Sequence, residues 1–131
     1  MTSNSDFDWV AVRSTCTASQ IFTQLQLGAD RDVAARNSTL PANAGFAYTL
    51  QSSGSMFSVA LNGNRIARMV TFELGAYSVS VRRGDTNETW EVTPTINDNG
   101  ECRLRMGNRD YECWQFRKLV LESLLFDNPW R

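Results

Sequence analysis

The sequence predicts a single α+β domain over residues 1–131, with an N-terminal helix, an antiparallel meander of about six to seven strands and a closing C-terminal amphipathic helix. Three observations predict this class. Apolar residues follow a helical period before Gly45, alternate with a period of two from Gly45 to Cys113, and return to a helical period after it. Short turns that contain glycine separate the alternating segments, so neighbouring strands should pair antiparallel. We expect a strongly bent sheet or an open barrel.

The N-terminal region should hold two elements after residues 1–5, which we expect to be disordered. Phe7 and Trp9 predict a short extended segment that docks against the core. Thr17 and Gln20 have the spacing of a capping box and predict the start of a helix. A glycine inside a helix costs about 1 kcal/mol relative to alanine. We therefore expect this helix to break into two at Gly28.

Alternating apolar and polar residues define the strands that follow. The predicted strands are 46–51, 56–61, 66–74, 77–83, 88–96, 102–106 and 109–113. The segment from Cys113 to Phe126 is apolar over a wide arc and predicts the closing helix, which Pro129 should stop.

The turns between these strands predict how residues pair across the sheet. The predicted cross-strand pairs are Val59 with Arg68, Phe57 with Val70, Phe72 with Val79, Val81 with Trp90, Arg83 with Glu88, Arg105 with Asp110 and Cys102 with Cys113. Within each run of paired strands the pairings keep face parity, which a wrong register would destroy, and this agreement supports the meander.

These pairs place charged residues on the face that should be apolar. Arg68, Arg83 and Glu88 form one row, next to a row that contains Phe57 and Trp90. Adjacent arginines repel each other and are costly to desolvate unless anions neutralise them. We interpret the row as a solvated rim whose arginine stems cover apolar surface. The alternative is a site for a small anionic or amphipathic ligand, in a pocket between the C-terminal helix and the sheet.

The cysteine content indicates a reducing environment. Cys16, Cys102 and Cys113 are odd in number and match no zinc-binding spacing. We expect Cys102 and Cys113 to be buried thiols that face each other. No basic segment followed by an apolar stretch opens the chain, and no apolar run approaches the ~20 residues of a membrane span. The sequence therefore predicts a cytoplasmic protein without membrane insertion.

Composition argues against most catalytic chemistry. The chain has no histidine, which removes histidine-assisted nucleophiles and most zinc and haem sites. A net charge of −1 gives no field that would attract nucleic acid. No phosphate-binding or dinucleotide motif occurs. We therefore predict no catalytic residue, metal or cofactor, and an enzyme using carboxylate and arginine chemistry is our third choice.

The leading functional hypothesis is a non-enzymatic binding or adaptor module that contacts another protein or a second copy of itself as a homodimer. The apolar arc of the last helix is wider than one sheet face needs, which leaves Trp114, Phe126 and Trp130 as candidate interface residues. An alternative of equal weight is that these side chains complete the chain's own core.

The order of the elements resembles two general architectures. One is that of pleckstrin-homology-like domains, in which a C-terminal helix caps a bent sheet. The other is that of helix-grip binders, in which a curved sheet wraps a terminal helix. The resemblance covers element order over the whole chain and includes no motif, so it implies no ligand.

Overall fold

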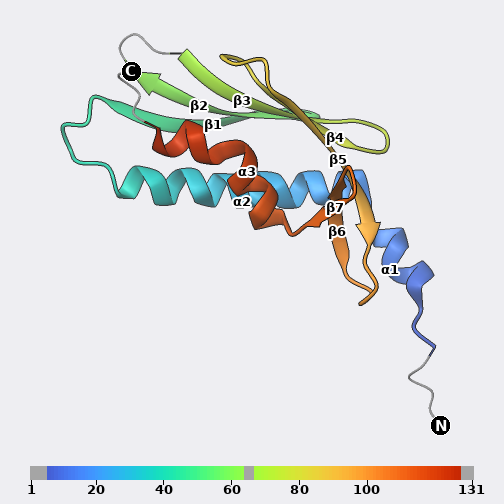
Figure 1. The fold of residues 1–131 in the computed structure, drawn as a ribbon. Helices are drawn as coiled ribbons and strands as arrows, with labels where there is room; N and C mark the ends of the chain where they lie inside the picture. The colour runs from blue at the N-terminus through green and yellow to red at the C-terminus, as the bar shows by residue number, and fades with distance from the viewer. Residues whose placement is uncertain (1–5, 64–66, 128–131) are drawn as a thin grey trace.

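The computed structural model describes residues 6–63 and 67–127 and confirms the predicted α+β class. Two helices come first, seven strands follow, and a third helix closes the chain (Figure 1). The elements are α1 (Trp9–Thr15), α2 (Ala18–Ser38), β1 (Phe46–Ser53), β2 (Met56–Gly63), β3 (Ala67–Leu74), β4 (Val79–Arg83), β5 (Thr89–Ile96), β6 (Cys102–Met106), β7 (Arg109–Tyr111) and α3 (Cys113–Phe126). The last helix has the predicted bounds.

The strands form one antiparallel meander in the order β1 to β7, and the sheet does not close into a barrel. β5 pairs with two neighbours along different halves of its length. Its first half, residues 89–92, pairs with β4, and its second half, residues 93–96, pairs with β6. The β6–β7 hairpin therefore continues from one end of the sheet, near α1 (Figure 1).

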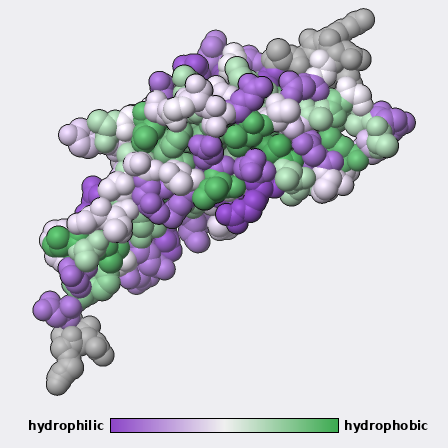
Figure 2. All heavy atoms as spheres, turned by 180° about the vertical axis from the view of Figure 1, so that it is seen from behind, coloured by the Kyte–Doolittle hydropathy of each residue, from purple (hydrophilic) through white to green (hydrophobic). Residues whose placement is uncertain are grey.

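Helices α2 and α3 lie side by side on one face of the sheet (Figure 1). The core lies between these two layers. Tyr48 of β1 shows how closely they are joined, because its buried hydroxyl donates a hydrogen bond of 2.9 Å to the carbonyl oxygen of Leu125 in α3. Burial of that hydroxyl raises the pKa of Tyr48. Seen from behind, hydrophobic residues lie in separate patches among hydrophilic ones (Figure 2).

The N-terminal segment is helical, so the prediction of an extended docking segment is wrong. The Asp8 side chain accepts a hydrogen bond from the Ala11 backbone amide, which caps the first turn of α1. Trp9 is 62% exposed and does not enter the core. Phe7 is half exposed, and its ring lies against the backbone of Gly100.

Helix α2 starts at the predicted cap, where Thr17 accepts a hydrogen bond from the Gln20 amide. It then runs without interruption through Gly28, so the prediction of a break there is wrong. A Cβ atom at position 28 would collide with the guanidinium group of Arg117 from α3. Glycine thus leaves the space through which Arg117 reaches Asp32 of α2, at an Nε–Oδ2 distance of 2.7 Å.

Two of the predicted strand registers are confirmed. Between β4 and β5, Val81 pairs with Trp90, and the Arg83 amide donates a hydrogen bond to the Glu88 carbonyl oxygen. Between β6 and β7, Arg105 pairs with Asp110. The loop and the two-residue turn therefore have the predicted lengths.

The registers on both sides of β3 are wrong by two residues. Phe72 pairs with Val81 and with Phe57, and Val70 pairs with Val59 and with Arg83. A shift of two residues keeps every side chain on its predicted face.

The cause of the shift between β3 and β4 is visible in the turn that joins these two strands. The Gly75 amide donates to the Ser78 carbonyl oxygen over 2.8 Å, so residues 75–78 form the loop and Leu74 pairs with Val79. Tyr77 is left 85% exposed. On the other side of β3, Arg68 pairs with Leu61 and not with Val59.

Candidate functional site

The predicted charged row becomes a compact ionic cluster at the end of β4. Arg83 points into the protein and is only 5% exposed. Its guanidinium group donates to both carboxylate oxygens of Asp85, at 2.7 and 3.1 Å, and to the hydroxyl of Ser123 in α3. The Nε atom of Arg68 lies 3.9 Å from Oδ2 of the same carboxylate. We call Arg68, Arg83, Asp85 and Ser123 the arginine cluster.

The anion that this arrangement requires is therefore supplied by the chain. Hydrogen bonding to Arg83, opposed by partial burial, gives a net lowering of the pKa of Asp85, and the positive charges of Arg83 and Arg68 add to it. The cluster thus pairs a buried cation with a permanently ionised carboxylate at neutral pH. Glu88, which we expected to supply charge, is exposed and accepts a hydrogen bond from the Thr86 hydroxyl at 3.1 Å.

The aromatic residues of the predicted ligand pocket lie in or against the core. Phe57 is 1% exposed, and its ring is stacked on Phe72 at a centroid distance of 4.3 Å and lies 5.3 Å from Phe22. Trp90 is half-buried and packs against the same core. The structure brings Arg68 and Arg83 together around Asp85, while the ring of Phe57 is covered by protein.

A groove opens on the outer side of the two helices. Its volume is about 440 Å³, and among the described residues its lining comes from α2, α3 and the residue that caps α2, not from the sheet. Leu121 and Leu125 of α3 and Ala35 of α2 form its apolar part. Its charged lining residues are Asp32, Arg36, Arg117, Lys118 and Glu122.

The cations of this groove are held by contacts within the chain. Arg117 pairs with Asp32, as described above, and Arg36 donates from Nε to the Leu125 carbonyl oxygen at 2.7 Å. Asp32 and Arg36, which stand four residues apart on α2, thus both contact residues of α3. The guanidinium carbon of Arg36 also lies 4.6 Å from the centre of the Phe126 ring, a cation–π contact.

Two of the three predicted interface residues border this groove. Trp114 is 53% exposed and Phe126 is 63% exposed, and both line the groove. The third, Trp130, lies outside the described residues. Lys118 and Glu122 stand between the two aromatic residues on α3, with their charged groups 3.2 Å apart.

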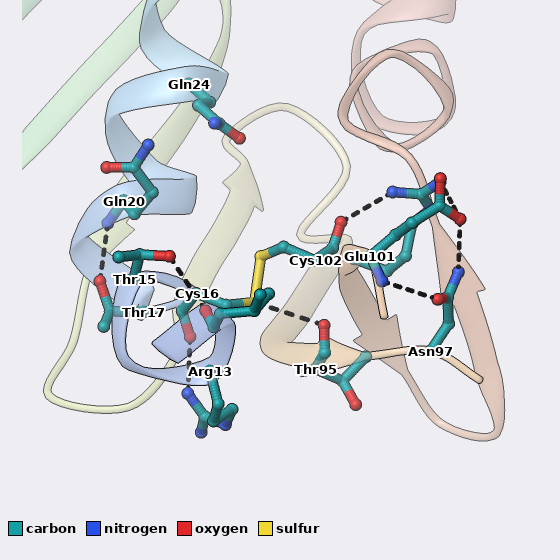
Figure 3. The surroundings of a disulfide bond; sticks show 12 residues. Arg13, Thr15, Cys16, Thr17, Gln20, Gln24, Thr95, Asn97, Glu101 and Cys102 are labelled. Atoms are coloured by element: carbon teal, nitrogen blue, oxygen red, sulfur yellow. Dashed lines mark hydrogen bonds and ion pairs between the residues drawn. A yellow bond between two sulfur atoms is a disulfide. The ribbon is translucent and has the colours of Figure 1, made fainter. Parts of the chain in front are cut away.

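A disulfide joins Cys16, at the junction of α1 and α2, to Cys102 in β6 (Figure 3). The prediction that Cys102 is a thiol facing Cys113 is therefore wrong. Cys16 comes within reach of Cys102 because the α1–α2 junction lies beside β5, where its sulfur is 3.3 Å from the Thr95 carbonyl oxygen. Alternation within the sheet gave no sign of this position, since Cys16 precedes the first strand by thirty residues.

Cys113 remains a free thiol at the first turn of α3. Its sulfur lies 3.5 Å from the side-chain oxygen of Gln24 in α2. Burial raises the pKa of Cys113, so the thiol stays protonated at neutral pH and is a poor nucleophile.

Sequence reasoning missed several residues of these sites. Asp85 lies between two predicted strands, and its place two residues after an inward-facing arginine was a usable signal. Arg36 and Arg117 act between α2 and α3, and Ser123 of α3 contacts Arg83 of β4, so only the packing of these elements brings them into place.

No helix within residues 6–63 and 67–127 is long and apolar enough to cross a bilayer. In the same ranges, no group of three or more histidine, cysteine, aspartate or glutamate residues is placed to hold a metal ion. Comparison with known proteins gives no further guidance: no family model, no curated protein and no solved structure matches this chain significantly.

Proposed function

We propose that the chain is a non-enzymatic binding module that acts through protein–protein contacts on the outer side of α2 and α3. The observation that carries this proposal is the position of Trp114 and Phe126, whose exposed rings border the groove between the helices. At about 1.5 Å of rise per residue, they stand roughly 18 Å apart along α3. Exposed aromatic residues are enriched among those that dominate binding between proteins.

The surroundings of these rings support the same function. Apolar residues line the groove, and charges of both signs stand around them, which is the usual arrangement of a protein interface. Arg36 and Arg117 are already fixed by partners in the chain. These two arginines would therefore lose little side-chain entropy when a partner binds.

The alternative of a small anionic ligand has weaker support. Asp85 already occupies the anion position between Arg68 and Arg83, and the groove beside α3 opens toward α2. The third alternative, an enzyme using carboxylates and arginines, gains no support from the arginine cluster, whose carboxylate is already paired with Arg83.

We also propose that the protein works in a non-reducing compartment, in place of the predicted cytoplasm. The support is the disulfide between Cys16 and Cys102, because such bonds persist where thiols are not kept reduced. Thiol labelling of protein taken from its native source, denatured without reductant, should then modify Cys113 alone. Labelling of all three cysteines would contradict the proposal.

The binding function can be tested by comparing partners of matched variants. Wild type, the double variant Trp114→Ala/Phe126→Ala and the control Tyr77→Ala are immobilised and exposed to an extract of the source cells. Tyr77 is a suitable control because it is also an exposed aromatic residue but lies in the β3–β4 turn. We expect a defined partner on wild type and Tyr77→Ala that is absent from the double variant, and the complex should reassemble from purified components. Equal retention on all three would contradict the proposal.

A further inference from the structure

The exposed side of α3 carries one continuous row of side chains. Trp114, Lys118, Glu122 and Phe126 follow one another at intervals of four residues, which aligns them as a ridge on the helix surface. All four are open to solvent: the two aromatic residues are 53% and 63% exposed, and the Lys118 and Glu122 side chains are 60% and 57% exposed. We call this row the α3 ridge.

A hollow lies along each side of the α3 ridge. The groove toward α2, of about 440 Å³, is lined by Leu121 and Leu125. The hollow toward β7, of about 350 Å³, is lined by Tyr111 and Leu119. Helices pack when the ridge of one enters the groove beside the ridge of the other, and rows spaced by four residues give the commonest class of such packing. The α3 ridge and its two hollows have that form.

The order of residues along the ridge is self-complementary. Read from either end, the ridge has an aromatic residue, two opposite charges and a second aromatic residue. Its midpoint along the helix axis lies at the level of Val120. A two-fold axis through that midpoint, with the helices antiparallel, places Lys118 opposite the partner's Glu122. The same operation places Trp114 opposite the partner's Phe126. Each contact then occurs twice, as a two-fold interface requires.

The parallel arrangement fails by the same reasoning. It would place Lys118 opposite the partner's Lys118, and Glu122 opposite the partner's Glu122, so that like charges face each other. The charges of the ridge therefore favour one relative orientation of two copies and disfavour the other.

At the end of the groove, Phe126 and Arg36 lie where the partner's Trp114 would approach. Arg36 lies over the Phe126 ring at 4.6 Å and is held in place by its hydrogen bond to the Leu125 carbonyl oxygen. An indole ring inserted there meets an aromatic ring and a guanidinium group whose positions are already set. The alignment that places Lys118 opposite the partner's Glu122 thus also brings the partner's Trp114 to this end of the groove.

We propose that the chain forms a two-fold symmetric dimer through antiparallel packing of the α3 ridges of two copies. This inference rests on the proposed binding function and names the partner as a second copy of this chain.

The test exchanges the charges on the ridge. Lys118→Glu leaves two negative charges on the ridge, and Glu122→Lys leaves two positive charges. Each variant alone should self-associate at least about tenfold more weakly than wild type, because like charges face each other across the axis. An equimolar mixture of the two should form a heterodimer, and the double variant Lys118→Glu/Glu122→Lys should form a homodimer again.

Sedimentation equilibrium measures these affinities against the monomer mass of 14.8 kDa. Both positions are exposed, so circular dichroism should show unchanged folding, and the double variant controls for any that does not. A wild-type protein that remains monomeric at about 100 µM would overturn the dimer, as would single variants that dimerise as tightly as wild type. The wider proposal fails separately, when Trp114→Ala/Phe126→Ala loses no partner of any kind in the extract experiment.

Discussion

The arginine cluster and the α3 ridge each contain a pair of opposite charges, but the cation is buried in the cluster and exposed on the ridge. Arg83 is 5% exposed, and its guanidinium group is enclosed by Asp85 and Ser123. Lys118 and Glu122 also form an ion pair, at 3.2 Å, but both side chains are more than half exposed. A buried cation without a partner strongly destabilises the fold, whereas an exposed pair contributes about 0.2–1 kcal/mol and stays available. The burial of a charge pair therefore indicates its role. A buried pair supports the fold, whereas an exposed pair remains available for binding.

The largest expected effect comes from a bond that belongs to neither region. The double variant Cys16→Ser/Cys102→Ser should lose about 2–5 kcal/mol of unfolding free energy, because the cross-link no longer restricts the unfolded chain. Denaturant titration measures this loss. Association through the α3 ridge should be unchanged in the variant as long as it stays folded. Cys113→Ser is the control, and equal stability of both variants and wild type would show that the disulfide does not form.

The next effect separates the two regions directly. Arg83→Leu leaves Asp85 and Ser123 without their donor and should lower the unfolding free energy by about 2–3 kcal/mol, less than for a fully buried pair because Asp85 is partly solvated. Lys118→Leu should change it by less than about 0.5 kcal/mol. Denaturant titration of both variants measures the difference. Equal losses would mean that the burial of Arg83 does not distinguish the cluster from the ridge.

The smallest effect is the pH dependence of the cluster. The pKa of Asp85 is lowered by folding, so its contribution is fully present above the unfolded pKa of about 3.9 and is lost as pH falls through the folded value. Asp85→Asn should therefore be less stable than wild type at pH 7, with the difference shrinking below about pH 4. Thermal unfolding across this range measures it, and Glu88→Gln serves as the control. A difference that stays constant with pH would contradict the assigned charge on Asp85.

The order from α2 through the strands to α3 could be predicted from the sequence because helical period, alternation and turn residues are local signals, whereas α1 was not predicted. The predicted β4–β5 and β6–β7 registers are confirmed because the lengths of the two connections were predicted correctly. The register between β3 and β4 is shifted because the Gly75 amide bonds to the Ser78 carbonyl oxygen and closes a longer loop than the predicted turn. Tyr77 lies in this loop and not at the start of β4. The face of each side chain survived this error, since a shift of two preserves it.

The candidate sites were harder to predict than the fold. Trp114 and Phe126 could be singled out as candidates because the apolar arc of α3 is wider than one sheet face needs, and both are exposed in the structure. Contacts between distant segments gave no comparable signal. Gly28 looked like a break in a helix, although it makes room for Arg117, and Cys16 gave no sign of its partner 86 residues away.

The disulfide has a consequence for how the molecule would respond to tension. If force were applied at the two ends of the chain, it would pass from Cys16 directly to Cys102 and bypass everything between them. The bypassed portion holds α2 and strands β1 to β5, with a sequence separation of 86. Roughly 290 Å of extensible chain would thereby be withheld from stretching. Only α1 and the segment from β6 through α3 would bear the load, so an oxidised molecule would lengthen in one short step and then resist.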